Sequence, residues 1–419
     1  MKKFKIIIFT FLFILIFSLF SFCSADDTST LDIYSPSAIL IESSTGKIIY
    51  EKNANEKMYP ASTTKIMTAI LTLENCNLTD TAIVSKNAVE SIPYGYATAY
   101  LKVGEELTIY QLLNVLLIAS ANDAAIVLAE HVAGSVESFC SMMNTKAQEL
   151  GCLNTNFVNA NGIHDENHYS TAYDLALIGN YAMENETFRD IVKTRSYTLP
   201  ATNKWTQNNR YFSNTNELLI KDTRDAVDNY YYEYCNGIKT GYTNAAKECI
   251  VASIKKDDLE FIVVTLGSDK TDNGLSQRYL DCKTLFNYAI QNYSTYKLND
   301  ANSVLKQIDI LNATKDTKTL DVIIQDKINI LISNSTDISS VSPKVDMNFA
   351  LIAPIKQNSV IGKITYTIDG FEYSSNLLAG SDVVESESFT LFFRILLIIV
   401  VLFLLYNIFH SKKKRYKYK

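Results

Sequence analysis

The chain is organised around the stretch Tyr59-Pro-Ala-Ser-Thr-Thr-Lys-Ile-Met-Thr-Ala69. A proline ends the extended run before it, and Ser62 then opens an apolar pattern with helical spacing. Lys65 follows one turn later, so the hydroxyl and the amine are predicted to project from the same face. A serine needs an adjacent base to become a nucleophile, and a desolvated lysine can lose its proton and supply that base. The N–H groups and dipole of a helix start would also favour an oxyanion at Ser62.

The spacing alone does not single out Ser62, because Ser-x-x-Lys recurs in this chain. An N-cap serine followed by a surface lysine gives the same pattern without any chemistry. The other occurrences begin at Ser44, Ser253, Ser294, Ser303 and Ser411. Only motifs further along the chain decide between the two interpretations.

A second polar pair lies in a tight connection between two apolar helical patterns. Helices are predicted from Leu107 to Ile118 and from Ala124 to Leu150, with Ser120 and Asn122 between them. Ordinary helix caps would explain these two side chains equally well, since Ser-x-Asn also begins at Ser85 and Ser374.

A third motif, Lys239-Thr240-Gly241, occurs once and enters a predicted strand of the central sheet. A lysine and a threonine at the head of such a strand can present a cation and a hydroxyl to a carboxylate. The glycine lets a ligand approach the backbone closely. A turn with a solvated lysine is the alternative for these three residues taken alone.

Taken together, the three motifs resemble those of the penicillin-interacting serine enzymes, in the same order. Residues from about Ser35 to Asn292 resemble the low-molecular-mass penicillin-binding proteins that act as serine-type D-alanyl-D-alanine carboxypeptidases. The neighbouring stretches Ser120-Ala-Asn-Asp-Ala-Ala125, Asn214-x-Asn-x-Leu-Leu and Gly237-Ile-Lys-Thr-Gly-Tyr-Thr243 match as well. The resemblance implies an α+β catalytic domain of the β-lactamase/transpeptidase-like type, with an antiparallel sheet flanked by helices and a helical subdomain.

The resemblance also implies chemical roles for the matching residues. Ser62 would attack the carbonyl of the D-Ala–D-Ala bond, with Lys65 as the general base. Ser120 would relay a proton toward the leaving nitrogen, and Asn122 would hydrogen-bond the substrate amide and Lys65. Penicillin and other β-lactam antibiotics would be covalent inhibitors that trap the same acyl-enzyme.

Substrate binding would fall to the third motif. Lys239 and Thr240 would hold the terminal carboxylate, beside Gly241. Backbone N–H groups of Ser62 and Tyr242 would form the oxyanion hole. Two positions depart from the family pattern, because Tyr242 stands where many relatives carry His and Ala246-Lys247 stands where an Ala-Gly pair is frequent. Neither departure removes a catalytic group.

The two ends of the chain predict export and anchoring. Residues 1–25 have the basic start, apolar run and small-residue cleavage site of a signal peptide. Residues 389–410 are long and apolar enough for a transmembrane helix, and the basic tail at 411–419 is predicted to be cytoplasmic. The protein would then be bound to the cell membrane, with its catalytic domain outside the cytoplasm.

The exported part is long enough for two domains. The catalytic domain is predicted at 26–297, a small all-β domain at 298–378 and a linker at 379–388. Short alternating apolar runs separated by Asn, Ser, Asp and Gly indicate the β structure. This second domain is interpreted as a spacer, with partner binding as the alternative.

Composition excludes several other classes of function. The formal net charge of the chain is −6. The predicted signal and tail contribute basic residues, so the exported part between them is more acidic than the whole chain. An acidic exported part argues against nucleic-acid binding. The cysteines lack C-x-x-C metal spacing. His164 and His168 have the spacing of a zinc pair but not the glutamate that such a motif requires. No metal or cofactor is therefore predicted.

Three rival functions remain at this stage. A class A β-lactamase shares the motifs but needs a further glutamate, usually in Glu-x-x-Leu-Asn, which is absent between the second and third motifs. A D,D-endopeptidase would use the same residues on cross-links. A non-catalytic cell-wall-binding protein would have no need for the complete set of nucleophile and base. The predicted substrate is the D-Ala–D-Ala end of a peptidoglycan stem peptide.

Overall fold

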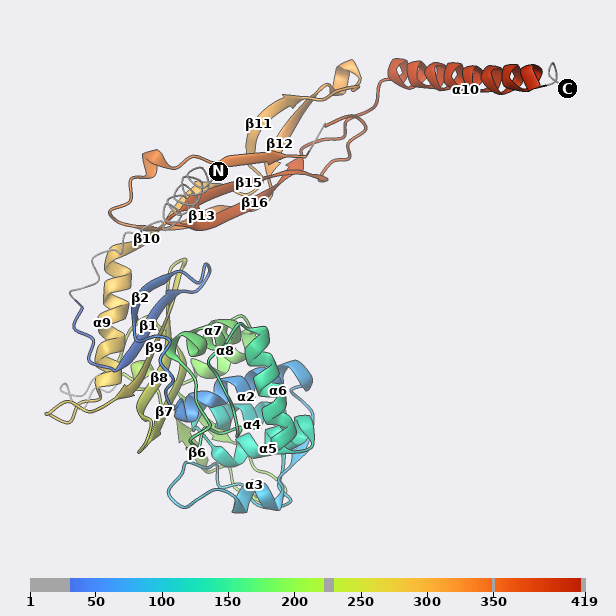
Figure 1. Cartoon of the computed structure of the whole chain (residues 1–419). Coiled ribbons are helices and arrows are strands. Elements are labelled where there is room, and N and C mark those ends of the chain that lie inside the picture. Colours follow the sequence, from blue (N-terminus) through green and yellow to red (C-terminus); the bar gives the residue numbers. More distant parts are fainter. Residues whose placement is uncertain (1–30, 222–229, 349–350, 416–419) are drawn as a thin grey trace, which may run out of the picture. The chain divides into compact units, whose positions relative to one another are not determined.

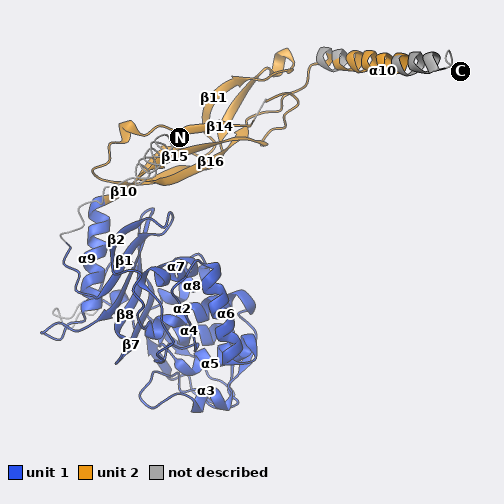
Figure 2. Ribbon diagram, viewed as in Figure 1, with its two compact units in different colours: residues 1–292 blue, residues 293–419 orange. Residues whose placement is uncertain are grey.

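The computed structural model describes residues 31–221, 230–348 and 351–415 of the 419-residue chain (Figure 1). The chain divides into two compact units, Met1–Asn292 and Tyr293–Lys419 (Figure 2). The predicted signal peptide at 1–25 lies outside the described residues. The predicted domain boundary between 297 and 298 falls within strand β10 (Tyr293–Asn299) and stays a prediction.

Unit 1 is built on a five-stranded antiparallel sheet with the order β2-β1-β9-β8-β7. Its strands are β1 (Ser37–Glu42), β2 (Ile48–Lys52), β7 (Cys235–Thr243), β8 (Lys247–Lys256) and β9 (Leu259–Ser268). Central strand β9 is buried from Phe261 onward, because helix α9 (Gln277–Asn292) covers one face of the sheet and the remaining helices cover the other (Figure 1). Strand β7 is an edge strand, and Gly237 to Gly241 on it are buried.

The helical part of unit 1 packs against the second face of the sheet. Its helices are α2 (Lys65–Asn75), α3 (Lys86–Glu90), α4 (Ile109–Ile118), α5 (Asn122–Ala133), α6 (Val136–Glu149), α7 (Ala172–Met183) and α8 (Glu186–Val192). Unit 1 also has two short antiparallel strand pairs. Strand β3 (Thr81–Ile83) pairs with β4 (Glu106–Thr108), and β5 (Ser196–Leu199) pairs with β6 (Arg210–Ser213). Thr108 and Gln111 form a capping box that starts α4, and Gly134 ends α5 with a φ of 78°. The apolar helices α2, α4 and α5 meet in the core, which fixes the position of their ends.

Unit 2 is a β structure with its own core. A five-stranded sheet has the order β11-β12-β16-β15-β14, and β10 pairs with β13. The strands are β11 (Val304–Asp309), β12 (Thr319–Ile324), β13 (Ile328–Ser333), β14 (Lys344–Met347), β15 (Val360–Ile368) and β16 (Phe371–Ala379). Asp369 and Gly370 both have positive φ and join β15 to β16, as expected for an Asp-Gly hairpin turn. The α+β architecture predicted for the first part and the all-β architecture predicted for the second are confirmed.

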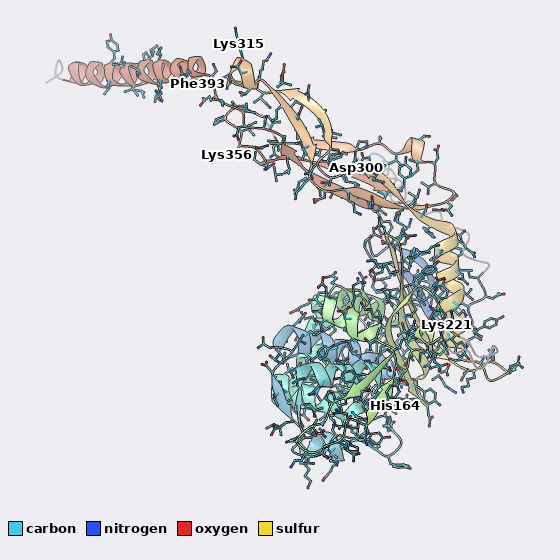
Figure 3. All side chains as sticks on the ribbon, turned by 180° about the vertical axis from the view of Figure 1, so that it is seen from behind. His164, Lys221, Asp300, Lys315, Lys356 and Phe393 are labelled. Atoms are coloured by element: carbon cyan, nitrogen blue, oxygen red, sulfur yellow. The ribbon has the colours of Figure 1, made fainter. Side chains whose placement is uncertain are left out.

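The predicted transmembrane helix at 389–410 is wrong. Residues Glu387–Arg415 do form a helix, α10, but within the described part of the chain no helix is long and apolar enough to cross a membrane. A bilayer core requires about 20 consecutive apolar residues. The side chain of Phe393, in the first part of α10, is labelled in Figure 3 and is 52% exposed. Part of the tail at 411–419 lies outside the described residues.

Candidate active site

Ser62 lies in a tight turn that leads into helix α2. The turn is a 3-10 helix, η1 (Ala61–Thr64), so the α-helix predicted to open at Ser62 begins at Lys65 instead. The N–H and hydroxyl of Thr63 both donate to the carbonyl of Pro60, at 3.2 and 2.7 Å, and close the turn. Ala61 has a φ of 48°, which L-residues rarely adopt. Backbone strain of this kind persists where the surroundings enforce it, and it is concentrated at functional sites.

Lys65 Nζ lies among three oxygen atoms in the protein interior. It is 2.9 Å from Ser62 Oγ and 2.9 Å from Asn122 Oδ1, and it also donates to the carbonyl of Asn161. Complete burial and the charge of Lys239 lower the pKa of Lys65 well below its ordinary value, against a smaller opposing effect of Asp123.

This arrangement suits a neutral Lys65. A neutral amine has two N–H groups and one lone pair. The two carbonyl-type oxygens, of Asn122 and Asn161, can only accept, so they take the two N–H groups. The lone pair is left for the hydroxyl of Ser62, which can donate. The geometry can therefore move the proton of Ser62 onto Lys65.

Ser120 and Asn122 lie in the connection from α4 to α5. Ser120 has a φ of 59° and lines the cleft beside Ser62, and Asn122 begins α5. The carboxamide of Asn122 is held from both sides, since Nδ2 donates to the carbonyl of Ala97 at 2.8 Å and Oδ1 accepts from Lys65. These partners leave only one orientation for the amide.

Lys239 and Thr240 lie on β7 and share a partner in Thr215. Lys239 is 1% exposed, and its Nζ donates to the carbonyl of Thr240 at 3.0 Å and lies 3.3 Å from Thr215 Oγ1. The hydroxyl of Thr240 donates to the same oxygen at 2.7 Å. Burial and the guanidinium of Arg278 lower the pKa of Lys239 to about 7.

Two glycines let backbone segments close around the Ser62 turn. A Cβ on Gly241 would lie 2.9 Å from the backbone nitrogen of Ser62 and 3.0 Å from the carbonyl oxygen of Pro60. Gly162 has a φ of 81°, and a Cβ there would lie 1.9 Å from the carbonyl oxygen of Ala61. Side chains at either position would force the segments apart.

A cleft of about 600 Å³ opens beside Ser62. Of the predicted site residues, those that line it are Ser62, Ser120, Asn122, Thr240, Gly241 and Tyr242. The side chains of Lys65 and Lys239 lie buried behind its wall. Direct hydrogen bonds join Lys65 to Ser62 and Asn122, whereas Lys239 and Thr240 are joined through Thr215.

The structure adds three residues that the sequence did not single out, and it places a fourth, His164, at the cleft instead of in a metal pair. Arg278, at the start of α9, donates from Nη1 to the carbonyl of Gly241 at 3.1 Å. Thr215 lies inside the Asn214-x-Asn motif, but nothing in the sequence marks the threonine itself. Asn161 contributes a backbone carbonyl, which any residue could supply. His164 lines the cleft, with its ring 4.5 Å from that of Tyr59 (Figure 3).

His164 and His168, which have the spacing of a zinc pair, have different surroundings: His164 lines the cleft, and His168 is buried. The Nε2 atom of His168 is 2.7 Å from Thr64 Oγ1, and its Nδ1 accepts from the N–H of Val158. Burial lowers the pKa of His168 to about 4, so this ring is neutral at physiological pH. No group of His, Cys, Asp and Glu within the described residues could hold a metal ion.

The fold and the site together define the class of the penicillin-binding proteins. The family D-alanyl-D-alanine carboxypeptidase, peptidase S11, matches residues 24–270, and the C-terminal domain of penicillin-binding protein 5 matches residues 293–385. The chain belongs to this D-alanyl-D-alanine carboxypeptidase family of serine peptidases.

Individual relatives agree with this assignment over most of the chain. D-alanyl-D-alanine carboxypeptidase DacF of Bacillus subtilis is 31% identical over 373 residues, which cover 88% of this chain and 90% of that protein. DacC of Escherichia coli is 27% identical over 385 residues, covering 90% and 91%. The crystal structure of penicillin-binding protein 5 from Haemophilus influenzae superposes with a TM-score of 0.65 at 26% identity, covering 84% of this chain and 98% of that one.

Proposed function

We propose that the protein releases the terminal D-alanine from peptidoglycan stem pentapeptides through an acyl-enzyme on Ser62, outside the cytoplasm where this polymer lies. The observation that carries the proposal is the 2.9 Å contact between Ser62 Oγ and the buried Lys65 Nζ. A general base needs hydrogen-bond reach to the proton it takes and a pKa suited to its working pH. Lys65 lies within that reach, and burial lowers its pKa, which is the direction that a base requires.

Acylation begins when the Ser62 oxygen attacks the carbonyl carbon of the penultimate D-alanine and its proton passes to Lys65 Nζ. Backbone N–H groups of Ser62 and Tyr242 stabilise the oxyanion, and one such donor is typically worth about 3 to 4 kcal/mol. The carbon–nitrogen bond then breaks. The leaving nitrogen takes a proton from Lys65 by way of Ser120, and D-alanine departs.

Deacylation reverses the proton path with water as the nucleophile. Water attacks the ester carbonyl and gives up a proton to the neutral Lys65, the ester bond to Ser62 Oγ breaks, and that oxygen takes the proton back. A β-lactam acylates Ser62 in the same way, but its amine stays tethered to the acyl group after the ring opens. The product therefore keeps its leaving group in the cleft.

The sheet side of the cleft suits the terminal carboxylate of the substrate. Lys239 and Arg278 supply positive charge, and Thr215 and Thr240 supply hydroxyl groups close to the Lys239 ammonium. Charge-assisted hydrogen bonds of this kind are about twice as strong as neutral ones. A D,D-endopeptidase activity would use the same nucleophile and base, because it also cleaves an amide bond after a D-alanine.

The β-lactamase alternative is not favoured by the composition of the cleft. Fast hydrolysis of a penicilloyl ester needs a further base to activate water. Among the described residues that line the cleft there is no aspartate or glutamate. We therefore expect a long-lived penicilloyl-enzyme.

The test is intact-mass analysis of the full chain after incubation with penicillin, together with D-alanine release from a D-Ala–D-Ala pentapeptide and cleavage of a cross-linked dimer into its two stem peptides. Ser62→Ala removes the nucleophile. Ser294→Ala is the matched control, because Ser294 begins another Ser-x-x-Lys on β10. We expect one adduct and D-alanine release with the wild type and the control, and neither with Ser62→Ala. Rapid penicillin turnover would establish a β-lactamase, and no adduct on folded wild-type protein would refute the enzyme.

A further inference from the structure

Directly after the Ser120-x-Asn122 motif stands an aspartate for which the proposed chemistry has no use. Asp123 is the second residue of helix α5, is 2% exposed and is not among the residues that line the cleft. Burial of a carboxylate is costly unless its oxygen atoms accept hydrogen bonds. The partners of Asp123 therefore show what this buried group holds in place.

The carboxylate of Asp123 ties a separate backbone segment, 97–101, to the start of α5. Both of its oxygen atoms accept from the N–H of Ala99, at 2.9 and 3.0 Å. Its Oδ2 also accepts from the N–H of Leu101 at 3.1 Å, and its Oδ1 accepts from the N–H of Ala124 at 2.9 Å. One side chain thus joins two backbone donors of the segment to one donor of the helix.

The same segment determines how the carboxamide of Asn122 is turned. The N–H and the Nδ2 of Asn122 both donate to the carbonyl of Ala97, at 2.9 and 2.8 Å, and its Oδ1 accepts from Lys65. A reversed amide would place an oxygen against the Ala97 carbonyl and an NH2 group against the amine. Since Ala97 is two residues from Ala99, the bonds from Ala99 to Asp123 place the carbonyl that orients Asn122.

The two directions along the segment differ in how firmly they are held. Arg210 Nη1 lies 3.5 Å from the carbonyl oxygen of Ala99, and its Nη2 lies 2.5 Å from Oε1 of Glu105 in a buried ion pair. In the opposite direction, Gly95 has no atom within 4 Å of the place where a Cβ would lie. The position of the Ala97 carbonyl therefore depends on the bonds at Ala99 and Leu101, and not on the open end of the segment.

We propose that Asp123 is a positioning residue for acylation: through Ala99 and Ala97 it keeps the carboxamide oxygen of Asn122 turned toward Lys65. The inference rests on the proposed function, because it assigns a support to the base of the same reaction. Asp123 exchanges no proton in this role and acts from behind the wall of the cleft.

Two other roles for Asp123 predict different behaviour. Its negative charge raises the pKa of Lys65, and an effect of that charge needs no contribution from Asn122. A role in the fold alone would change the unfolding temperature and leave the rate of the folded enzyme unchanged. A double-mutant cycle between Asp123 and Asn122 separates these roles, because residues that act through one another have non-additive effects.

The experiment measures stopped-flow acylation by penicillin and D-alanine release from a D-Ala–D-Ala pentapeptide, with thermal unfolding of each protein. The full-length proteins are the wild type, Asp123→Asn, Asn122→Ala and the double variant. Asp123→Asn keeps the shape of the side chain but replaces one accepting oxygen by an NH2 group that faces a backbone N–H. Should Asp123→Asn not fold, Asp123→Ser, which retains one accepting oxygen, replaces it in the cycle.

Asp281→Asn is the matched control. Asp281 lies on α9, is 1% exposed and accepts from the backbone N–H groups of Tyr34 and Ser35, at 3.3 and 2.7 Å. It therefore ties a separate segment to a helix as Asp123 does, but the segment that it holds contributes no residue to the cleft.

We expect Asp123→Asn to slow acylation and to lower kcat/KM for the peptide by about 10- to 100-fold, the size of a small displacement of reacting groups. In the Asn122→Ala background the same substitution should change either rate by less than about twofold, since the group that it positions is then missing. Asp281→Asn should stay within about twofold of the wild type, as expected for a site that does not couple to the cleft.

Equal losses from Asp123→Asn in both backgrounds would overturn the proposal, because Asp123 would then act by its charge or through the fold. An unchanged rate in folded Asp123→Asn, or an equally large loss in Asp281→Asn, would overturn it as well. All three results leave the proposed function intact. Absence of both the penicillin adduct and D-alanine release from the folded wild type would instead refute the proposed function and this inference with it.

Discussion

The two walls of the cleft each carry a buried lysine, and their surroundings give the two amines different properties. Lys65, on the helical wall, is enclosed by the Ser62 hydroxyl and two obligate acceptors. Lys239, on the sheet wall, lies beside threonine hydroxyls and the Thr240 carbonyl. Burial lowers the pKa of both, to about 7 for Lys239 and well below the ordinary value for Lys65.

The difference shows how one residue type can serve as a base and as an anion anchor in a single site. Lys65 has a partner that can give it a proton, and a second cation nearby disfavours its charge. Lys239 lies buried behind the sheet wall, and a carboxylate bound at that wall would raise the pKa of Lys239. Substrate binding would thus charge Lys239 and, through it, help to keep Lys65 neutral.

The largest effect is expected when the amine of Lys65, on the helical wall, is replaced by a group that cannot accept a proton. Lys65→Arg keeps the positive charge but cannot lose it, because a guanidinium is not deprotonated in proteins. We expect acylation by penicillin to slow by about 10³-fold or more, at the upper part of the range for general-base catalysis. Stopped-flow acylation kinetics measure this, with Lys86→Arg on the exposed helix α3 as the control. Unchanged kinetics would mean that Lys65 is not the base.

A smaller loss should follow from displacing the backbone around Lys65 and Ser62. Gly162→Ala places a Cβ 1.9 Å from the carbonyl oxygen of Ala61, next to the Asn161 carbonyl that Lys65 uses. Displacing reacting groups by about 1 Å can cost 10²-fold in rate. We expect a loss of about that size in acylation.

Gly151→Ala is a matched control for this substitution. Gly151 has the same φ of 81° but no atom within 4 Å of the added Cβ, so it shares the backbone strain and lacks the clash. It should lose about 1 to 2 kcal/mol of unfolding free energy with unchanged acylation. Equal behaviour of the two variants would show that strain, and not contact with the Ser62 turn, determines the effect.

The titration of Lys239, on the sheet wall, should appear in the pH dependence of kcat/KM. Lys239 is charged below its pKa of about 7 and loses its proton above it. For a peptide with a free terminal carboxylate, kcat/KM should therefore fall above about pH 7, by up to about tenfold per pH unit. A peptide whose terminal carboxylate is replaced by an amide should lack this fall. The Lys239→Arg variant should lack it too, since it stays charged. The same fall for the amide would assign the titration to another group.

The sequence allowed the helical wall and the sheet wall to be predicted, because each carries its chemistry in a short motif at an element boundary. Ser62 and Lys65 are one turn apart, and Lys239 to Gly241 head a strand. Thr215 and Arg278 could not be predicted, since only the packing of η2 (Glu217–Leu219) and α9 near β7 brings them to the site. The all-β unit followed from alternation, whereas the apolar run at 389–410 was wrongly predicted to span a membrane.

The last prediction concerns stability instead of rate: the support of the helical wall should show acid sensitivity. His168 contacts Thr64, next to Lys65, and is held neutral with a pKa of about 4 against an ordinary value of 6.5. A group with a depressed pKa binds protons more readily in the unfolded chain. Stability is therefore lost as the pH falls from about 6.5 to 4, by up to about 3 kcal/mol.

His168→Gln should remove this acid-dependent part of the unfolding free energy, and His131→Gln, at an exposed histidine of α5, should leave it in place. Urea unfolding followed by the fluorescence of Trp205, the single tryptophan of the chain, reports on unit 1. If His168→Gln keeps the full acid dependence, the titration of His168 is not its cause. Asp123 cannot replace it in this role, because burial raises the pKa of its carboxyl group in the folded chain. A raised pKa makes the folded state more stable, not less stable, as the pH falls.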